Sequence, residues 1–170
     1  MRIIRDHRYV APRDRGASAA VGNFDGVHLG HLSVIELARR EAGRLGAPLG
    51  VVTFEPHPRE FFAPGATPFR LMGREARAHR LEKVCVARLY ELNFNAALSS
   101  LDPREFARDV LADGLGLRQV VVGEDFRFGK GRAGGAEDLL RYGAEMGFGV
   151  TLAPLLAGNG GQVSSTAIRT

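Results

Sequence analysis

The sequence predicts an α/β fold in which a mostly parallel sheet of five strands is flanked by helices. Five short apolar segments, several of them rich in valine and bounded by glycine or proline, are typical of buried strands. Helical patterns lie between these segments, and strands that alternate with helices form the crossover units of a parallel sheet covered on both faces. A chain of 170 residues with 45% hydrophobic composition fits a single domain with a sizeable core.

The predicted strands cover about residues 17–22, 49–54, 83–89, 118–122 and 150–153. The clearest helical pattern covers residues 29–45, with an apolar face and a charged face. A second helix begins near Asp102, a typical N-cap residue that is followed by a proline at the first helical position. A third covers residues 136–146 and ends at Gly147. Two glycine-rich segments, 123–135 and 157–161, are predicted to be mobile loops.

Charge and cysteine content narrow the classes of function. The formal net charge is +4 and the sequence pI is about 9.8, which favours anionic partners such as nucleotides. Acidic residues are interleaved with the basic ones, so no nucleic-acid partner is predicted. Cys85 is the only cysteine, which excludes an internal disulfide and a thiolate zinc site. Without a signal peptide or a membrane-length apolar run, we expect a soluble cytoplasmic protein with no membrane partner.

The segment "GNFDGVHLGH", residues 22–31, follows the first predicted strand and opens the first predicted helix. His28 and His31 are three residues apart, so in a helix they project from the same side of the first turn. The free N–H groups and positive dipole of a helix N-terminus already attract phosphate. This spacing indicates a site for an anion that gains charge during a reaction. Two alternatives remain open at this point: capping histidines with ordinary hydrogen bonds, or a metal site that includes Asp25.

The segment "SSTAIR", residues 164–169, has the composition of a second anion site. Three hydroxyl groups precede an arginine, whose guanidinium group can hold a phosphate through two hydrogen bonds. An ordinary serine N-cap is the alternative.

Two loops carry aromatic residues. The loop 123–135 contains five glycines, and Phe126 and Phe128 within it could pack against a planar ring while backbone N–H groups contact a phosphate. The segment "FEPHP" places two prolines around His57, which would stiffen one wall of a flat pocket. Plain alternatives are a flexible loop in the first case and a strand-ending turn over the core in the second.

Taken together, these motifs resemble the FAD synthetase (FMN adenylyltransferase) module of the prokaryotic bifunctional riboflavin kinase/FAD synthetase, within the nucleotidylyltransferase superfamily that carries an HxGH signature. The resemblance extends over most of the chain and rests on five segments in order: "GNFDGVHLGH" at 22–31, "TFEPHPREFF" at 53–62, "LNFNAALSSLDPREFARDVL" at 92–111, "VVVGEDFRFGKGRAGG" at 120–135 and "VSSTAIR" at 163–169. It implies a Rossmann-like, doubly wound nucleotidylyltransferase fold. It also implies adenylyl transfer from ATP to FMN, with FAD and pyrophosphate as products.

The resemblance also implies roles for individual residues. The catalytic residues would be His28, His31 and Ser165. The ATP-binding residues would be Gly22, Asn23, Phe24, His28, Gly30, His31, Ser164, Ser165, Thr166 and Arg169. The flavin-binding residues would be Pro56, His57, Pro58, Asp125, Phe126 and Phe128. Mg²⁺ would be carried by ATP, with no metal ligand assigned to the protein.

The resemblance implies that residues 1–170 would form one FAD synthetase domain, and we expect the C-terminal riboflavin kinase domain of the family to be absent from this chain. Two other functions fit the same residues. The acceptor could be another phosphate ester, such as phosphopantetheine or nicotinate mononucleotide, or the nucleotide could be CTP. The chain could also be a noncatalytic module that binds nucleotides or nucleic acid through its basic charge.

Overall fold

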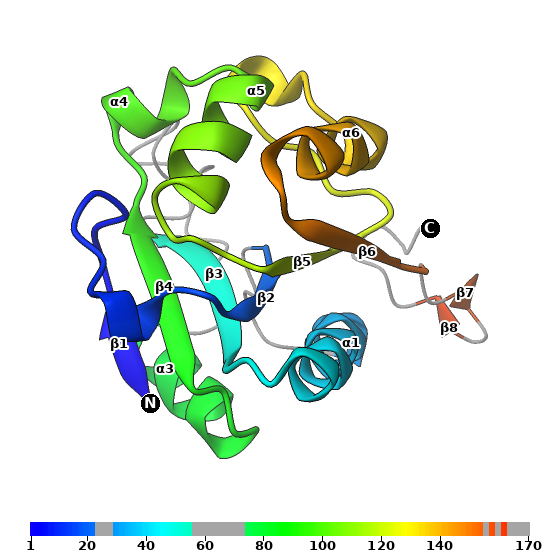
Figure 1. Ribbon diagram of the computed structural model, residues 1–170. Coiled ribbons are helices and arrows are strands. Elements are labelled where there is room, and N and C mark those ends of the chain that lie inside the picture. Colours follow the sequence, from blue (N-terminus) through cyan, green and yellow to red (C-terminus); the bar gives the residue numbers. More distant parts are fainter. Residues whose placement is uncertain (23–28, 56–73, 155–156, 159–160, 163–170) are drawn as a thin grey trace, which may run out of the picture.

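A parallel sheet of six strands forms the centre of the computed structural model, which describes residues 1–22, 29–55, 74–154, 157–158 and 161–162 (Figure 1). The sheet has the order β1-β4-β3-β2-β5-β6. Its strands are β1 (Arg2–Ile4), β2 (Ser18–Val21), β3 (Leu49–Glu55), β4 (Arg88–Asn93), β5 (Gln119–Gly123) and β6 (Gly149–Ala153). A separate antiparallel pair consists of β7 (Ala157–Gly158) and β8 (Gly161–Gln162).

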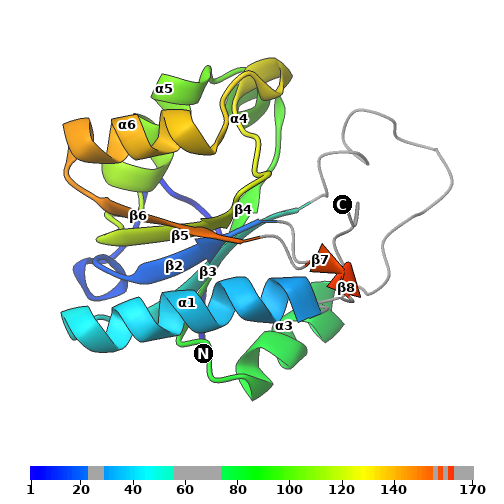
Figure 2. The ribbon, with the colours of Figure 1, turned by 90° about the vertical axis from the view of Figure 1, so that its right-hand side faces the viewer.

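Helices cover both faces of this sheet (Figures 1 and 2). One face is covered by α1 (Leu29–Leu45) and α3 (Arg74–Lys83). The other carries α4 (Ala96–Ser99), α5 (Pro103–Glu105), the π-helix η2 (Phe106–Ala112) and α6 (Ala136–Met146). Two short 3₁₀ helices, η1 (Pro12–Asp14) and η3 (Lys130–Arg132), lie in connections. The predicted α/β class and doubly wound arrangement are therefore confirmed.

Local sequence signals place the helix ends well. The first helix begins and ends at the predicted residues, Leu29 and Leu45. Asp102 accepts a hydrogen bond from the backbone N–H of Glu105, whose carboxylate accepts one from the N–H of Asp102, so the pair forms a capping box. Gly147 ends α6 in the left-handed conformation, with a φ of 92°.

Two strand predictions differ from the structure. The segment predicted as strand 83–89 begins as the end of α3, and β4 starts at Arg88. Cys85 has a φ of 67°, which no strand residue adopts, and Val86 is buried in the turn against α1 and α3. The apolar run therefore reflects a buried turn as well as a strand. The sheet has six strands and not the predicted five. Sequence patterns do not reveal the sixth, β1, because it has only three residues, of which Ile4 alone is buried.

The direction in which successive strands are added to the sheet reverses between β2 and β5. From β2 the chain moves outward to β3 and β4, then returns to the other side of β2 to form β5 and β6. All paired strands of this sheet are parallel, so their carboxyl ends lie along one edge (Figure 2). In open α/β sheets, ligands bind beyond the carboxyl ends of the strands at such a reversal.

No helix in the described ranges combines the length and the apolar composition needed to cross a membrane.

A buried carboxylate holds the N-terminal segment to the opposite, amino edge of the sheet. Asp14 is 3% exposed, and its Oδ1 lies 2.6 Å from Arg2 Nε and 3.0 Å from Arg88 Nε. Arg2 and Arg88 are the first residues of β1 and β4. The hydroxyl of Tyr90 donates a hydrogen bond to the backbone oxygen of Asp14, at 2.6 Å. The hydrogen bond from Arg2 lowers the pKa of Asp14.

This lowered pKa predicts a loss of stability in acid. A carboxyl group whose pKa is lower in the folded state contributes stability above its unfolded pKa, about 3.9, and loses it as the pH falls through the folded value. Thermal unfolding of the wild type and Asp14→Asn between pH 7 and pH 3 checks this. We expect a clear difference in Tm at pH 7 that shrinks below about pH 4. A difference that stays constant across this range would contradict the role given to the Asp14 carboxylate.

Candidate functional site

The reversal point of the sheet brings together the ends of β2 and β5. Ala20 is paired with Val121, so the continued register puts Gly22 and Gly123 at the same level. The N–H of Gly22 donates a hydrogen bond to the oxygen of Val52, at 3.0 Å, and thereby holds the end of β2 against β3. Gly22 therefore lies at the edge where a ligand is expected.

The first turn of α1 lies at the same edge (Figure 2). The helix begins at Leu29, so the backbone of Gly30 and His31 belongs to this first turn. Its free N–H groups favour an anion, and the turn contains no acidic residue that would oppose one. Three other residues predicted to bind ATP here, Asn23, Phe24 and His28, lie outside the described residues.

Backbone hydrogen bonds shape the loop that follows β5, which the sequence predicts to be mobile. The N–H of Phe126 donates to the oxygen of Gly123, at 3.0 Å, and so turns the chain back at the strand end. Phe128 and Gly134 exchange two backbone hydrogen bonds of 3.0 Å each. The N–H of Lys130 donates to the oxygen of Leu101, at 2.7 Å. These bonds give the loop a defined shape beside the carboxyl edge.

Close packing against Pro103 explains two of the loop's glycines. Gly129 has a φ of +82°, and a Cβ there would lie 2.7 Å from the nitrogen of Pro103. A Cβ on Gly134 would lie 2.8 Å from the Cβ of Pro103. The glycines therefore let the loop pack on the start of α5.

An aromatic cluster connects this loop to the end of β3. Phe126 stacks on Phe128, with ring centroids 5.7 Å apart and 14° between the planes. Phe128 contacts Phe106 at 5.8 Å between centroids, and Phe106 contacts Phe54 at 6.2 Å. Phe94 packs against Phe54 edge to face at 5.9 Å. Phe54 is the next-to-last residue of β3, and Phe126 and Phe128 lie in the loop that follows β5. The cluster therefore joins the carboxyl ends of these two strands.

The three flavin-binding residues predicted in the loop differ in exposure. Asp125 is exposed and Phe126 is half-buried, so both can contact a ligand. Phe128 is 5% exposed and also packs edge to face against Tyr142. This position suits a residue that supports Phe126 from behind. The sequence does not distinguish the two phenylalanines, because they are only two positions apart in a loop without periodicity.

The remaining predicted site residues are Pro56, His57, Pro58, Ser164, Ser165, Thr166 and Arg169, and they lie outside the described residues. Glu55 is the last described residue before the proline segment.

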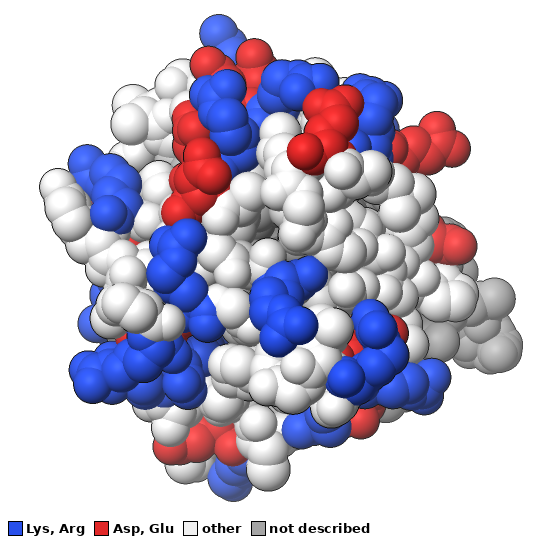
Figure 3. All heavy atoms as spheres, in the orientation of Figure 1, with Lys and Arg blue, Asp and Glu red and all other residues white. Residues whose placement is uncertain are grey.

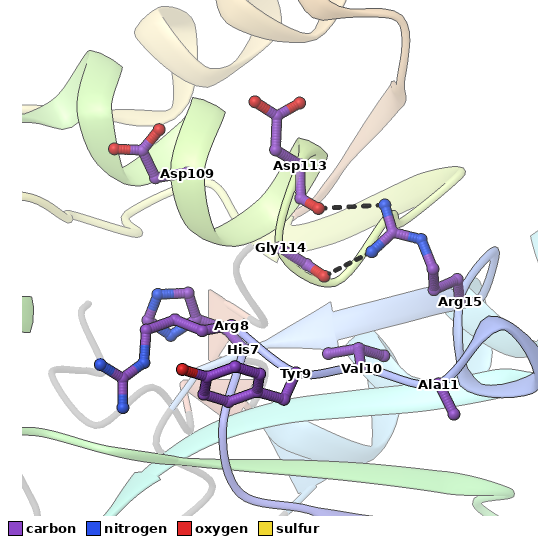
Figure 4. A pocket seen from close by; sticks show the side chains of 9 residues that line it. All are labelled: His7, Arg8, Tyr9, Val10, Ala11, Arg15, Asp109, Asp113 and Gly114. Carbon is purple, nitrogen blue, oxygen red and sulfur yellow. Dashed lines mark hydrogen bonds between the residues drawn. The ribbon is translucent and has the colours of Figure 1, made fainter.

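A pocket of about 740 Å³ lies elsewhere, between residues 7–11 and the end of η2 (Figure 4). Arg15 donates hydrogen bonds to the backbone oxygens of Gly114, at 2.8 Å, and Asp113, at 3.0 Å. Burial lowers the pKa of His7, which disfavours its charged form. None of the residues predicted for the site lines this pocket. The hydrogen bonds of Arg15 fasten the N-terminal part of the chain to the turn that follows the π-helix.

Basic side chains over α5 and α6 are largely paired with acidic ones, and Figure 3 shows blue and red groups alternating in this region. The ion pairs here are Arg104–Glu145, Arg108–Asp109 and Arg141–Asp138. Among the residues that the structure describes, no group of three His, Cys, Asp or Glu side chains could hold a metal ion.

Comparison with known proteins identifies relatives over the whole chain. The FAD synthetase family model matches residues 10–167. A bifunctional riboflavin kinase/FMN adenylyltransferase from Pseudomonas fluorescens is 42% identical, and one from Escherichia coli strain K12 is 34% identical. Each alignment covers 99% of this chain and 54% of the relative. The chain thus spans about half the length of these curated relatives.

Solved structures share the fold at lower sequence identity. A Streptococcus pneumoniae protein, titled a macrolide-efflux protein, superposes with a TM-score of 0.77 at 24% identity, over 96% of this chain and 54% of that one. A pantothenate synthetase from Thermus thermophilus gives a TM-score of 0.51 at 18% identity, over 92% of this chain and 62% of that one. At these identities the likeness concerns the fold alone.

Proposed function

The chain belongs to the FAD synthetase family, and on this premise we propose that it is an FMN adenylyltransferase that makes FAD and pyrophosphate from FMN and ATP. The observation that carries the proposal is the family match over residues 10–167. Residues 1–170 would form one adenylyltransferase domain. Because the named relatives are bifunctional and about twice as long, a riboflavin kinase domain is the partner we propose for it.

In the proposed reaction, an oxygen of the FMN phosphate attacks the α-phosphorus of ATP. The bond from that phosphorus to the oxygen bridging the α- and β-phosphates breaks, and pyrophosphate leaves with the bonding electrons. No protein nucleophile is needed, so catalysis consists of positioning and charge stabilisation. The first turn of α1, with no acidic residue, suits this task. His28 and His31 would bind the phosphates and the charge that develops on them.

The nucleotide would lie where β2 and β5 separate. Gly22 has no side chain to obstruct it, and Asn23, Phe24 and Gly30 complete the proposed contacts on this side. Mg²⁺ would be carried in by ATP and would neutralise part of the phosphate charge. The first turn of α1 has no carboxylate that could bind a metal ion. This fits a Mg²⁺ ion that would be held mainly by the phosphate oxygens of ATP.

FMN would lie toward β3 and the loop after β5. The half-buried ring of Phe126 offers an aromatic face for the isoalloxazine, and Phe128 holds that ring from behind. Asp125, exposed beside it, can accept hydrogen bonds from the ligand. Pro56, His57 and Pro58 would form the facing wall.

Ser164, Ser165, Thr166 and Arg169 would hold the departing pyrophosphate. We therefore expect Ser165→Ala to raise KM for ATP while KM for FMN stays near the wild-type value. Loss of one hydrogen bond to a charged group predicts a change of about tenfold. Initial rates measured against each substrate in turn check this. Superimposable ATP titrations for the two proteins would place the pyrophosphate site elsewhere.

The direct test of the proposed function is chromatographic. The purified chain is incubated with ATP, MgCl₂ and one acceptor at a time: FMN, nicotinate mononucleotide or phosphopantetheine. We expect FAD and pyrophosphate in equal amounts with FMN, and no adenylylated product with the other two acceptors. A product from another acceptor and none from FMN would contradict the proposal.

A further inference from the structure

Arginines gather at the amino edge of the sheet, opposite the edge of the proposed catalytic site. Arg2 and Arg88 are the first residues of β1 and β4, and Arg118 directly precedes β5. Arg13 lies in η1, and Arg15 follows this helix on the way to β2. Figure 3 looks onto this edge, and its blue groups cross the middle of the view with fewer red neighbours than at the top. The amino edge therefore carries an excess of positive charge.

The exposed arginines of this group have no carboxylate partner in the described part of the chain. Arg2 and Arg88 share the buried carboxylate of Asp14. Arg13, Arg15 and Arg118 are exposed, and none of them forms an ion pair with another described residue. This differs from the surface over α5 and α6, where arginines and carboxylates are paired. The charges at the amino edge are thus available to an anionic partner.

Arg15 and Arg118 lie next to each other across one backbone contact. The N–H of Gly16 donates a hydrogen bond to the oxygen of Gly116, at 2.9 Å. A Cβ on Gly116 would lie 2.7 Å from Arg15 Nη2, and a Cβ on Gly16 would lie 3.8 Å from Arg118 Cδ. Both side chains therefore pass directly over this glycine pair, and the close contact at Gly116 leaves no room for a larger residue.

Hydrogen bonds hold both guanidinium groups without neutralising them. Arg15 donates to the backbone oxygens of Asp113 and Gly114, and Arg118 donates to that of Leu45, at 3.1 Å. These bonds cap the ends of η2 and α1. Figure 4 shows the carboxylate of Asp113 pointing away from Arg15. A guanidinium group has more N–H donors than these contacts use, so each arginine is held in place with donors left for a further acceptor.

A hollow lies beside each of these arginines. Arg15 lines the pocket of about 740 Å³ described above, and Arg118 lines a second hollow of about 500 Å³ (Figure 4). Apolar side chains contribute to the wall of the second hollow: Leu45, Ala112, Leu117, Met146 and Phe148. A partner that combines carboxylates with an apolar side chain therefore fits both the charge and the shape of this edge.

The surroundings favour an acidic protein segment over a nucleic acid. Asp109 and Asp113 line the first hollow, where they would repel the closely spaced phosphates of a nucleic-acid backbone. The carboxylates of a protein segment can instead be spaced so that they reach the arginines and avoid these two groups.

We propose that the amino edge of the sheet is a docking surface for an acidic segment of another protein. Arg15 and Arg118 bind carboxylates of this segment, and an apolar side chain of the segment enters the second hollow. Because this edge lies opposite the proposed catalytic site, a docked protein leaves that site open to ATP and FMN. The inference does not depend on the proposed function.

The test measures binding of a rhodamine-labelled, glutamate-rich peptide with a central leucine by fluorescence anisotropy. We expect saturable binding to the wild type that weakens as the salt concentration rises. A variant with both Arg15→Gln and Arg118→Gln should show a rise in Kd of about tenfold, the combined effect of two exposed charge contacts. Because both arginines also cap helix ends, thermal unfolding of this variant is recorded, and Arg118→Gln alone serves as a milder variant with a rise of about threefold.

A variant with both Arg104→Gln and Arg141→Gln is the matched control, since it removes the same charge from arginines that are paired with carboxylates. It should bind the peptide as the wild type does. Absence of peptide binding to the wild type would overturn the proposal, and so would an equal loss of affinity in the control variant. Tighter binding of a single-stranded DNA of similar charge would assign this edge to nucleic acid instead. Failure of the wild type to form FAD would refute the proposed function and would leave this test unaffected.

Discussion

Replacing His28 with alanine is expected to lower kcat for FAD formation by about 10²- to 10³-fold, the range found for removal of one preorganised donor to a developing charge. KM for FMN should change little, because an interaction that strengthens in the transition state affects turnover more than substrate binding. Initial rates at saturating ATP, with FMN varied, measure both constants.

His79→Ala provides the control for this experiment, since His79 is an exposed residue of α3. It should retain wild-type kinetics. A His28→Ala variant with unchanged kcat would contradict the assignment of His28 to charge stabilisation and would leave that task to His31 and the helix N-terminus.

Phe128→Ala is expected to have the largest effect on stability. Phe128 is 5% exposed and contacts the rings of Phe106, Phe126 and Tyr142. Truncation of a buried phenylalanine costs about 3–5 kcal/mol, since both the transfer energy and the packing around the cavity are lost. For a domain of this size, that corresponds to a fall in Tm on the order of 10 °C. Phe126 would also lose its stacking partner, so FMN affinity should fall.

Differential scanning calorimetry and FMN titration below the lowered Tm separate these two effects. Tyr9→Ala is the matched control, because it removes another aromatic ring from a side chain that is 79% exposed. Its Tm should stay within about 2 °C of wild type, as expected for most surface substitutions. Phe128→Ala with wild-type FMN affinity would contradict the supporting role of Phe128.

The elements that the sequence predicts well are those with local signals. The amphipathic pattern from Leu29 to Leu45, the Asp102 cap and the terminal Gly147 all depend on neighbours within one or two turns. The predicted start of β4 is wrong because apolar spacing does not reveal the positive φ of Cys85. β1 was missed because three residues beside β4 carry no periodicity of their own.

In the site, the sequence predicts residue types better than it predicts their arrangement. It identified Phe126 and Phe128, but their different exposure arises from packing against Phe106, which is distant in sequence. At the opposite edge of the sheet, it also did not place Arg15 next to Arg118, because the hydrogen bond between Gly16 and Gly116 joins distant parts of the chain.

The fate of the α-phosphorus of ATP tests the central claim most directly. The chain is incubated with FMN, Mg²⁺ and ATP labelled either at the α-phosphorus or at the γ-phosphorus, and the products are separated. Adenylyl transfer predicts that the α-label appears in FAD and the γ-label in pyrophosphate. An α-label that remains in ATP, ADP or free AMP, with no labelled FAD, would contradict the assignment of this chain as an FMN adenylyltransferase.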